Sequence, residues 1–107
     1  MADIGSVQIL TPTPGATVTV TISTVHRHIL AKWTAGEAET VNISGAPVDG
    51  QLLTFIITND ATLGRIVTLG TGLLGLGIIT NIVSKKSTVQ LVALDGTFHE
   101  LSRSVGL

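Results

Sequence analysis

The sequence predicts an all-β protein, a β-sandwich or jelly-roll-like domain. Short runs rich in Val, Ile and Thr recur between turn residues along all 107 residues, as expected of a sandwich or barrel. No long segment keeps apolar residues at helical spacing, and an Asp-Gly pair joins two strand-like runs near the C-terminus. A chain of this length has room for one domain. We place it at residues 16–107, after an extended N-terminal arm at residues 1–15.

The arm is set apart by Thr11-Pro12-Thr13-Pro14-Gly15. Each proline fixes its own φ, lacks a donor and biases the preceding residue towards extended conformations. The expected strands, one in the arm and the others in the domain, are residues 7–10, 16–23, 25–33, 40–44, 52–58, 65–69, 78–83, 88–94 and 97–103. A short helix near residues 29–39 is the alternative at that point, but Thr34 and Gly36 oppose it.

Strict alternation marks residues 16–23, where Val18, Val20 and Ile22 share one face and threonine hydroxyls the other. One face of this strand is therefore expected to be buried. The phase changes after Ser23, because Ile29 and Ala31 continue the apolar pattern on odd positions. A slip of one residue would turn the core side outward, so a bulge or bend is expected near Ser23.

Asp95-Gly96 predicts a two-residue hairpin, since a type I′ turn requires positive φ at both central residues. The register follows from the turn. Leu94 should face Thr97, Ala93 should face Phe98, Val92 should face His99, and Leu91 should face Glu100. His99 and Glu100 then lie on opposite faces of the strand. Asp49-Gly50 and Asn59-Asp60 mark other turns.

The composition predicts self-association. Hydrophobic residues make up 44 % of the chain and charged residues 12 %, about half the usual share of charge. A small domain exposes much of its surface, so apolar residues that do not fit inside must face water or another chain. The net charge of −1 gives no reason to expect a nucleic-acid partner. The absence of cysteine excludes disulfides and thiolate sites.

Two segments bear on localisation. The acidic start Met1-Ala2-Asp3-Ile4 lacks the pattern of a signal peptide, so we expect the chain to be made and kept in a cytoplasm until assembly.

Residues 66–83 carry no charge and just reach the length of a spanning helix. Four glycines and several β-branched residues in this segment favour strands and loops instead, so no membrane partner is expected.

Gly70-Thr71-Gly72-Leu73-Leu74-Gly75 matches the dinucleotide-binding pattern G-x-G-x-x-G, with Asp95 at a suitable distance downstream. That motif requires a helix whose N-terminus holds the pyrophosphate. Leu76-Gly77-Ile78-Ile79-Thr80 follows instead, which is a poor helix and a good strand. We therefore expect a tight loop between strands and assign no cofactor and no cofactor-binding residue.

His26-Arg27-His28 places two imidazoles at i and i+2 of an expected strand, on one face and about 7 Å apart. A monomer offers two ligands, whereas three copies around a three-fold axis would offer six nitrogens, enough for an octahedral metal site. The alternative is two partly exposed histidines on a polar strand face, because neutral imidazoles are tolerated at many surfaces. We favour the alternative and assign no metal ligand.

The remaining polar residues do not predict an enzyme. Asp3, Asp49, Asp60 and Asp95 lie at the terminus or at turns, where Asp serves backbone hydrogen bonding. Glu37 and Glu39 are expected in a solvated loop, Ser102 and Ser104 lack a nucleophile-elbow pattern, and Lys85-Lys86 is expected to blunt a strand end. Asn42-Ile43-Ser44 fits a glycosylation acceptor by chance. We assign no catalytic residue.

Four segments within residues 37–104 carry a family resemblance. They are Thr40-Val41-Asn42-Ile43, Ala46-Pro47-Val48-Asp49-Gly50-Gln51, Thr68-Leu69-Gly70-Thr71-Gly72, and the run from Thr88 through Asp95-Gly96 to Glu100. This turn-and-strand pattern resembles a β-domain of bacteriophage virion proteins, found in capsid decoration (cement) proteins and in tail-fibre or spike modules. The usual Trp or Tyr after the last turn is absent, and Phe98 lies nearest. The resemblance implies a homotrimer that binds other virion proteins.

The leading functional expectation is a capsid decoration protein on the phage head, which bridges major capsid proteins, because fibre subunits usually carry a longer chain. The alternative is a small tail-fibre, tail-tip or receptor-binding subunit. Carbohydrate sites usually present aromatic platforms, and the chain has three aromatic residues, Trp33, Phe55 and Phe98. A small jelly-roll isomerase or dioxygenase would need a cluster of histidine and carboxylate residues that the sequence does not show.

Overall fold

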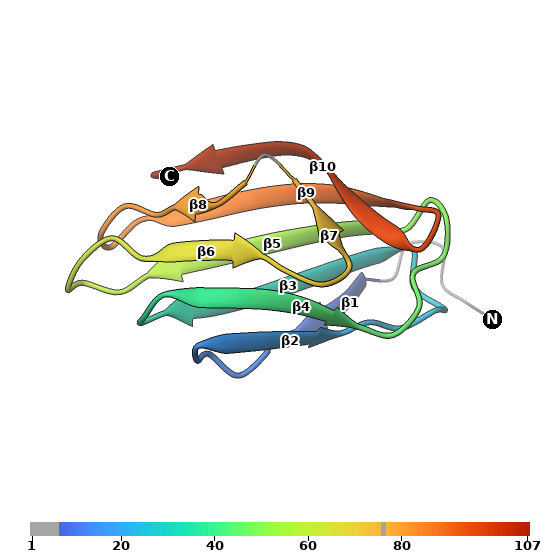
Figure 1. Cartoon of the computed structure of the whole chain (residues 1–107), viewed down its shortest axis with the longest axis horizontal. Coiled ribbons are helices and arrows are strands. Elements are labelled where there is room, and N and C mark those ends of the chain that lie inside the picture. The colour runs from blue at the N-terminus through green and yellow to red at the C-terminus, as the bar shows by residue number, and fades with distance from the viewer. Residues whose placement is uncertain (1–6, 76) are drawn as a thin grey trace.

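A computed structural model describes residues 7–75 and 77–107 of the chain (Figure 1). These residues form ten strands and no helix. In chain order the strands are β1 (Val7–Leu10), β2 (Thr17–Thr21), β3 (His28–Ala35), β4 (Glu39–Ser44), β5 (Leu52–Asn59), β6 (Ile66–Leu69), β7 (Leu73–Leu74), β8 (Ile79–Thr80), β9 (Lys86–Leu94) and β10 (Thr97–Val105). The all-β prediction is confirmed.

The strands form two sheets that lie face to face (Figure 1). Sheet A has six strands in the order β1-β3-β5-β9-β10-β7, and sheet B has four in the order β2-β4-β6-β8. From β1 to β6 the chain alternates between the sheets, and each strand lies parallel to the strand two positions earlier. This part of the chain therefore winds as a flattened coil. The antiparallel strands β8, β9 and β10 complete the two sheets.

The predicted β-sandwich or jelly-roll arrangement is wrong in its connectivity, which is that of a β-solenoid. His28 lies opposite Val7 on one side and Leu52 on the other, one turn of the coil before and after it. Jelly rolls pair their strands antiparallel within two Greek keys, whereas β1 to β6 pair in parallel. Here the connections after β1 to β5 each cross to the facing sheet. Pairing partners along this coil depend on loop paths, which periodicity within one strand does not specify.

The core lies between the two sheets. Among the described residues, eighteen buried hydrophobic side chains from both sheets form one cluster. Phe55 and Phe98 are fully buried, and Trp33 packs edge-to-face on Phe55 with ring centroids 5.4 Å apart. Burial alternates along β3, β5 and β9, so each of these strands turns one face to the core and one outward.

The alternation predicted for residues 16–23 is confirmed, since Val18 and Val20 are fully buried and Ile22 is nearly so. The chain bends at Thr24 and Val25, which confirms the bend predicted near Ser23. Between β2 and β3 the chain leaves sheet B and crosses to sheet A. The inward side reverses because the two sheets face each other across the core.

The Asp95-Gly96 hairpin is confirmed in its register and turn geometry. All four predicted pairs from Leu94–Thr97 to Leu91–Glu100 are present. Asp95 has a φ of 54° and Gly96 a φ of 80°, as a type I′ turn requires. The pairing then shifts between Glu100 and Ser102, where β10 carries a bulge.

Residues 7–10 of the predicted arm form β1, which pairs in parallel with β3 at the edge of sheet A. Residues 1–6, with Asp3 and the acidic start, lie outside the described residues. The division of the chain at residue 15 stays a prediction.

Residues 66–83 form the short strands β6, β7 and β8 with loops between them, apart from Leu76, which lies outside the described residues. Thr71 and Gly72 form the turn of the predicted tight loop, which the Leu73 amide closes on the Gly70 carbonyl, and Gly72 adopts a φ of 83°. Within the described residues, no helix is long and apolar enough to cross a membrane.

Candidate functional site

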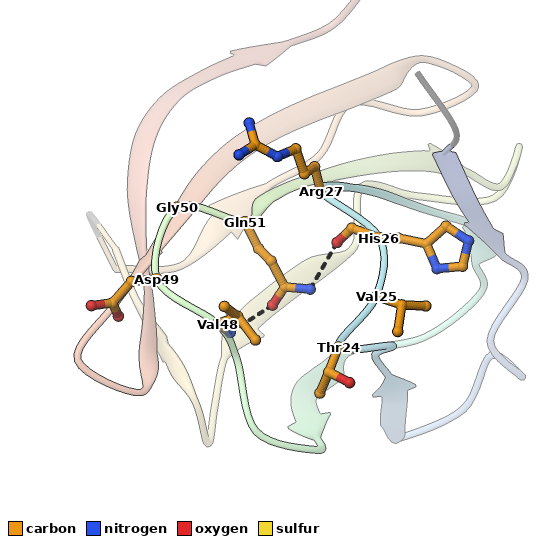
Figure 2. A pocket seen from close by; sticks show the side chains of 8 residues that line it. All are labelled: Thr24, Val25, His26, Arg27, Val48, Asp49, Gly50 and Gln51. Atoms are coloured by element: carbon orange, nitrogen blue, oxygen red, sulfur yellow. Dashed lines mark hydrogen bonds between the residues drawn. The ribbon is translucent and has the colours of Figure 1, made fainter. Parts of the chain in front are cut away.

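Two crossover loops form a cleft of about 200 Å³ at one end of the coil (Figure 2). One wall is the β2–β3 loop with Thr24, Val25, His26 and Arg27, and the other is the β4–β5 loop from Val48 to Gln51. Both loops carry the chain from sheet B to sheet A, so the winding of the coil brings them together.

Gln51 joins the two loops. Its side chain is buried, and its Nε2 donates to the Ser23 carbonyl at 2.7 Å and to the His26 carbonyl at 2.9 Å. Its Oε1 accepts from the Val48 amide at 2.7 Å. Figure 2 shows the amide of Gln51 lying between the two loops. An amide side chain supplies both the donors and the acceptor that these three backbone groups need.

Other polar groups of this cleft also hold the backbone. Asp49 Oδ1 accepts from the Asp95 amide at 2.9 Å, which ties the β4–β5 loop to the β9–β10 hairpin. The Nδ1 atom of His26 lies 3.0 Å from the Ser23 hydroxyl. These contacts give Gln51, Asp49 and His26 structural roles. The polar groups of this cleft thus hold the two crossover loops together.

The geometry proposed for a His26 and His28 metal pair is wrong. The expected strand at residues 25–33 begins only at His28, so His26 lies in the preceding loop. The two residues therefore do not occupy i and i+2 of one strand face. The structure shows no group of three His, Cys, Asp or Glu side chains able to hold a metal ion within residues 7–75 and 77–107.

Glu39 is buried rather than solvated, which corrects the expectation for the Glu37 and Glu39 pair. Its Oε1 accepts from Trp33 Nε1 at 2.7 Å, and its Oε2 accepts from the Gly15 amide at 3.3 Å. Burial raises the pKa of the Glu39 carboxyl, and these two hydrogen bonds oppose the rise. Glu37 lies in the exposed loop between β3 and β4. The carboxylate therefore anchors the tryptophan and the start of β2.

An ion pair on β10 was not predicted from the sequence. Arg103 donates to both carboxylate oxygens of Glu100, with Nε at 2.6 Å and Nη2 at 2.7 Å. The bonds to Glu100 raise the pKa of Arg103. Arg103 Nη1 also donates to the Ile78 carbonyl at 2.7 Å. The pair thereby fixes the segment before β8 against β10. His99 instead lies 3.3 Å from the Leu94 carbonyl.

Asp49 and Asp60 accept hydrogen bonds from backbone amides, as predicted for aspartates at turns, and Asp95 lies in the β9–β10 turn. Asp60 pairs with Arg65 at 2.7 Å across the β5–β6 loop, and the hydrogen bond from Arg65 lowers the pKa of Asp60. Asn59 organises the same loop, since its Oδ1 accepts from the Arg65 amide at 2.7 Å. Asn42 of the glycosylation-like triplet accepts from the Thr71 amide at 2.8 Å. Its side chain thus supports the glycine-rich loop.

The outer face of sheet A carries several exposed apolar side chains among polar ones. We define it by the outward positions of β1, β3, β5, β9 and β10, and none of these carries a carboxylate. Large apolar side chains exposed there are Val7 (47 %), Ile9 (60 %), Leu52 (36 %), Leu94 (51 %) and Leu101 (62 %). A groove of about 270 Å³ lies among His28, Leu52, Thr54, Gln90 and Leu101.

A second apolar surface comes from the uncharged segment, residues 66–83. Exposed side chains there are Ile66, Leu74, Ile78, Ile82 and Val83. A shallow cleft of about 220 Å³ lies beside Leu69, Leu73, Leu74 and Ile78. This surface lies where the sheets end in the two-residue strands β7 and β8.

The outer face of sheet B is richer in hydroxyl groups and shares Ile66 with the second apolar surface. Hydroxyl side chains occupy most outward positions of its strands, with Asn42 and Ile66 at the others: Thr17, Thr19 and Thr21 on β2, Thr40 and Ser44 on β4, Thr68 on β6 and Thr80 on β8. Thr17, Thr40 and Thr68 form one row across three parallel strands. The body therefore has one broad face lined mostly by hydroxyl groups and one on which apolar and polar side chains are mixed.

Comparison of the sequence with known proteins returned no matching family model and no matching curated protein.

Proposed function

We propose that this chain is a structural protein of a bacteriophage particle, a capsid decoration (cement) protein. In this proposal it forms trimers on the phage head and bridges major capsid proteins. The observation that carries the proposal is the number of large apolar side chains exposed on one small body, both on the outer face of sheet A and along the uncharged segment. One surface serves contacts between copies, and the other serves contacts with the capsid.

Exposed apolar area supports this role on energetic grounds. Side chains such as Ile9, Leu101 and Leu107 are each at least 60 % exposed. Burial of such area contributes roughly 25 cal/mol per Å². Apolar patches of this kind mark interaction surfaces in monomeric folds. A subunit seated across a boundary between capsid proteins would raise the free energy needed to separate them by mass action.

The polar groups that hold the loops in place also favour a binding role. Polar groups at the crossover loops hold the loops together, as described for Gln51 and Asp49. The ion pairs of Asp60 with Arg65 and of Glu100 with Arg103 fix loops or strand segments. Each of these groups contributes to a rigid body that presents broad surfaces. Rigid presentation lowers the entropic cost of docking.

Purified phage particles test the proposal. We expect the protein to copurify with heads, and particles lacking it to release DNA at lower temperature or at lower denaturant concentration. Recovery from tail fractions alone, with unchanged head stability on deletion, would reject the decoration role and favour the tail-fibre alternative. In solution, the expected trimer has three times the 11.0 kDa mass of one chain.

A further inference from the structure

We infer that copies of this chain exchange strand β1, so that β1 of one protomer pairs with β3 of the next and three protomers close a ring. The inference rests on the proposed function, which requires a trimer, and it names the segment that joins the copies. In the single chain, β1 lies on β3 of the same chain at the edge of sheet A (Figure 1).

The contact between β1 and β3 shows what the edge of β3 accepts. Four residue pairs in parallel register join the two strands. Gln8 Oε1 accepts from the Ser23 amide at 2.9 Å, and Leu10 packs against the core cluster. All of these contacts join β1 to the coil, and none of them lies within β1 itself. The same strand from a second copy can therefore make every one of them.

The linker between β1 and β2, residues 11–16, makes few contacts with the rest of the chain. Within the described part of the chain, residues 11–14 make no hydrogen bond, and the Gly15 amide donates one to Glu39 Oε2 at 3.3 Å. A shallow cleft of about 200 Å³ lies between the linker and β2. The chain is held in sheet B from Ala16 onward, where the Ala16 carbonyl accepts from the Thr40 amide at 2.9 Å. The linker can therefore move with little loss of structure.

The linker bends at Gly15 and Ala16, next to the start of β2. Pro12 and Pro14 fix their own φ and favour extended conformations of the residues before them. Gly15 has no Cβ, so a change of its backbone dihedrals that turns β1 outward costs little. The linker thus combines a stiff extended segment with a hinge at its end, which is what the exchange of a strand requires.

The linker is long enough to reach a neighbouring copy. Six extended residues span about 20 Å, whereas two facing sheets lie about 10 Å apart. Residues 7–16 carry no charged side chain, so their passage from one copy to the next brings no like charges together. β1 can therefore leave sheet A of its own chain and pair in sheet A of an adjacent copy.

The exchange joins two different surfaces, the strand β1 of one copy and the β3 edge of another. Such a heterologous contact generates a ring when the rotation between copies closes. Each chain then gives one strand and receives one, so no β3 edge is left open. The ladder between β1 and β3 is the same within one chain and between two chains. The exchange therefore loses none of its hydrogen bonds, and a higher protein concentration favours the ring by mass action.

A pair of introduced cysteines tests the exchange, because the chain has no cysteine of its own. Ile9 and Leu30 are Cα partners on β1 and β3, and both occupy outward positions, at a separation that a disulfide accepts. The variant Ile9→Cys with Leu30→Cys is purified reduced, separated by size-exclusion chromatography, oxidised, and analysed by electrophoresis without reductant. In the oligomer we expect disulfides between chains, up to a covalent trimer of three times the 11.0 kDa mass.

Lys32→Cys with Ile56→Cys is the matched control, since these Cα partners join β3 to β5 on the same face. Its disulfide should form within one chain in the oligomer. Ile9→Cys alone should give no covalent species. Val7→Cys with His28→Cys repeats the test at the other end of the β1–β3 ladder if the first pair does not fold.

Disulfides confined to single chains within an oligomer would overturn the exchange and leave the proposed function standing. Covalent dimers of Ile9→Cys alone would also overturn it, because they would place two β1 strands side by side. A wild-type protein that is monomeric at every concentration would overturn both the exchange and the trimer. Absence of the protein from phage particles would instead reject the decoration role, whatever disulfides the variants form in solution.

Discussion

Replacement of Gln51 by methionine keeps the length of the side chain and removes the hydrogen bonds between the two crossover loops. The amide makes three bonds of 2.7 to 2.9 Å, to Ser23, His26 and Val48. A net contribution of about 0.5–1.5 kcal/mol for each bond gives a range of roughly 1.5–4.5 kcal/mol. His26 lines an open cleft, so water can reach part of this network. We therefore expect a loss of about 2 kcal/mol.

Urea denaturation followed by circular dichroism measures this loss as a lower midpoint with an unchanged slope. The melting temperature should fall by about 10 °C, since a domain of this size shifts by roughly 4–8 °C for each kcal/mol. Thr62→Met is the control, because the Thr62 side chain is exposed in the β5–β6 loop, away from both crossover loops. A loss for Gln51→Met within about 0.5 kcal/mol of the control would refute the assignment of Gln51 as the link between the loops.

Three further predictions concern stability. Gly96→Ala should lower the free energy of unfolding by about 1 kcal/mol, measured by urea denaturation, because Gly96 has a φ of 80°. A Cβ at Gly96 would meet no other atom, so the cost comes from the backbone alone. Gly15→Ala, at an ordinary φ, should not lower it, and equal effects of the two substitutions would contradict the turn assignment. Glu39→Gln should gain stability relative to wild type as pH rises above the ordinary carboxyl range, because the raised pKa of Glu39 makes ionisation cost the native state free energy. A difference independent of pH would argue against burial of the charge. Asp60→Asn should be less stable than wild type at about pH 7 and equal to it at about pH 2, since the lowered pKa of Asp60 stabilises only the ionised form. Persistence of the gap in acid would exclude the ion pair with Arg65 as its source.

The local features of the fold were predictable because they depend on residues close in the chain. Alternation at Val18, Val20 and Ile22 identified the buried face of β2, and Asp95-Gly96 fixed both the turn and the register of β9 with β10. The glycines within residues 66–83 correctly indicated loops and short strands. Each of these signals needs two to eight neighbouring residues and no knowledge of the rest of the chain.

The parts of the surface that carry the proposals were only partly predictable. Scarce charge indicated that apolar side chains would face outward, and fifteen large hydrophobic side chains are exposed among the described residues. The strand order decides which of these exposed side chains lie on the same face. Leu52 on β5 and Leu101 on β10 line one groove because β9 lies between their strands.

The sequence by itself determined the all-β class, the one-faced strands and the final hairpin, since these arise from backbone preferences and from the two-residue period of a strand. Only the tertiary structure decided the solenoid winding, the burial of Glu39 against Trp33 and the bulge that pairs Glu100 with Arg103. These features depend on contacts between residues that are distant in the chain, or that a regular strand would place on opposite faces. Their free energy depends on the packing of the whole coil, which no local pattern in the chain encodes.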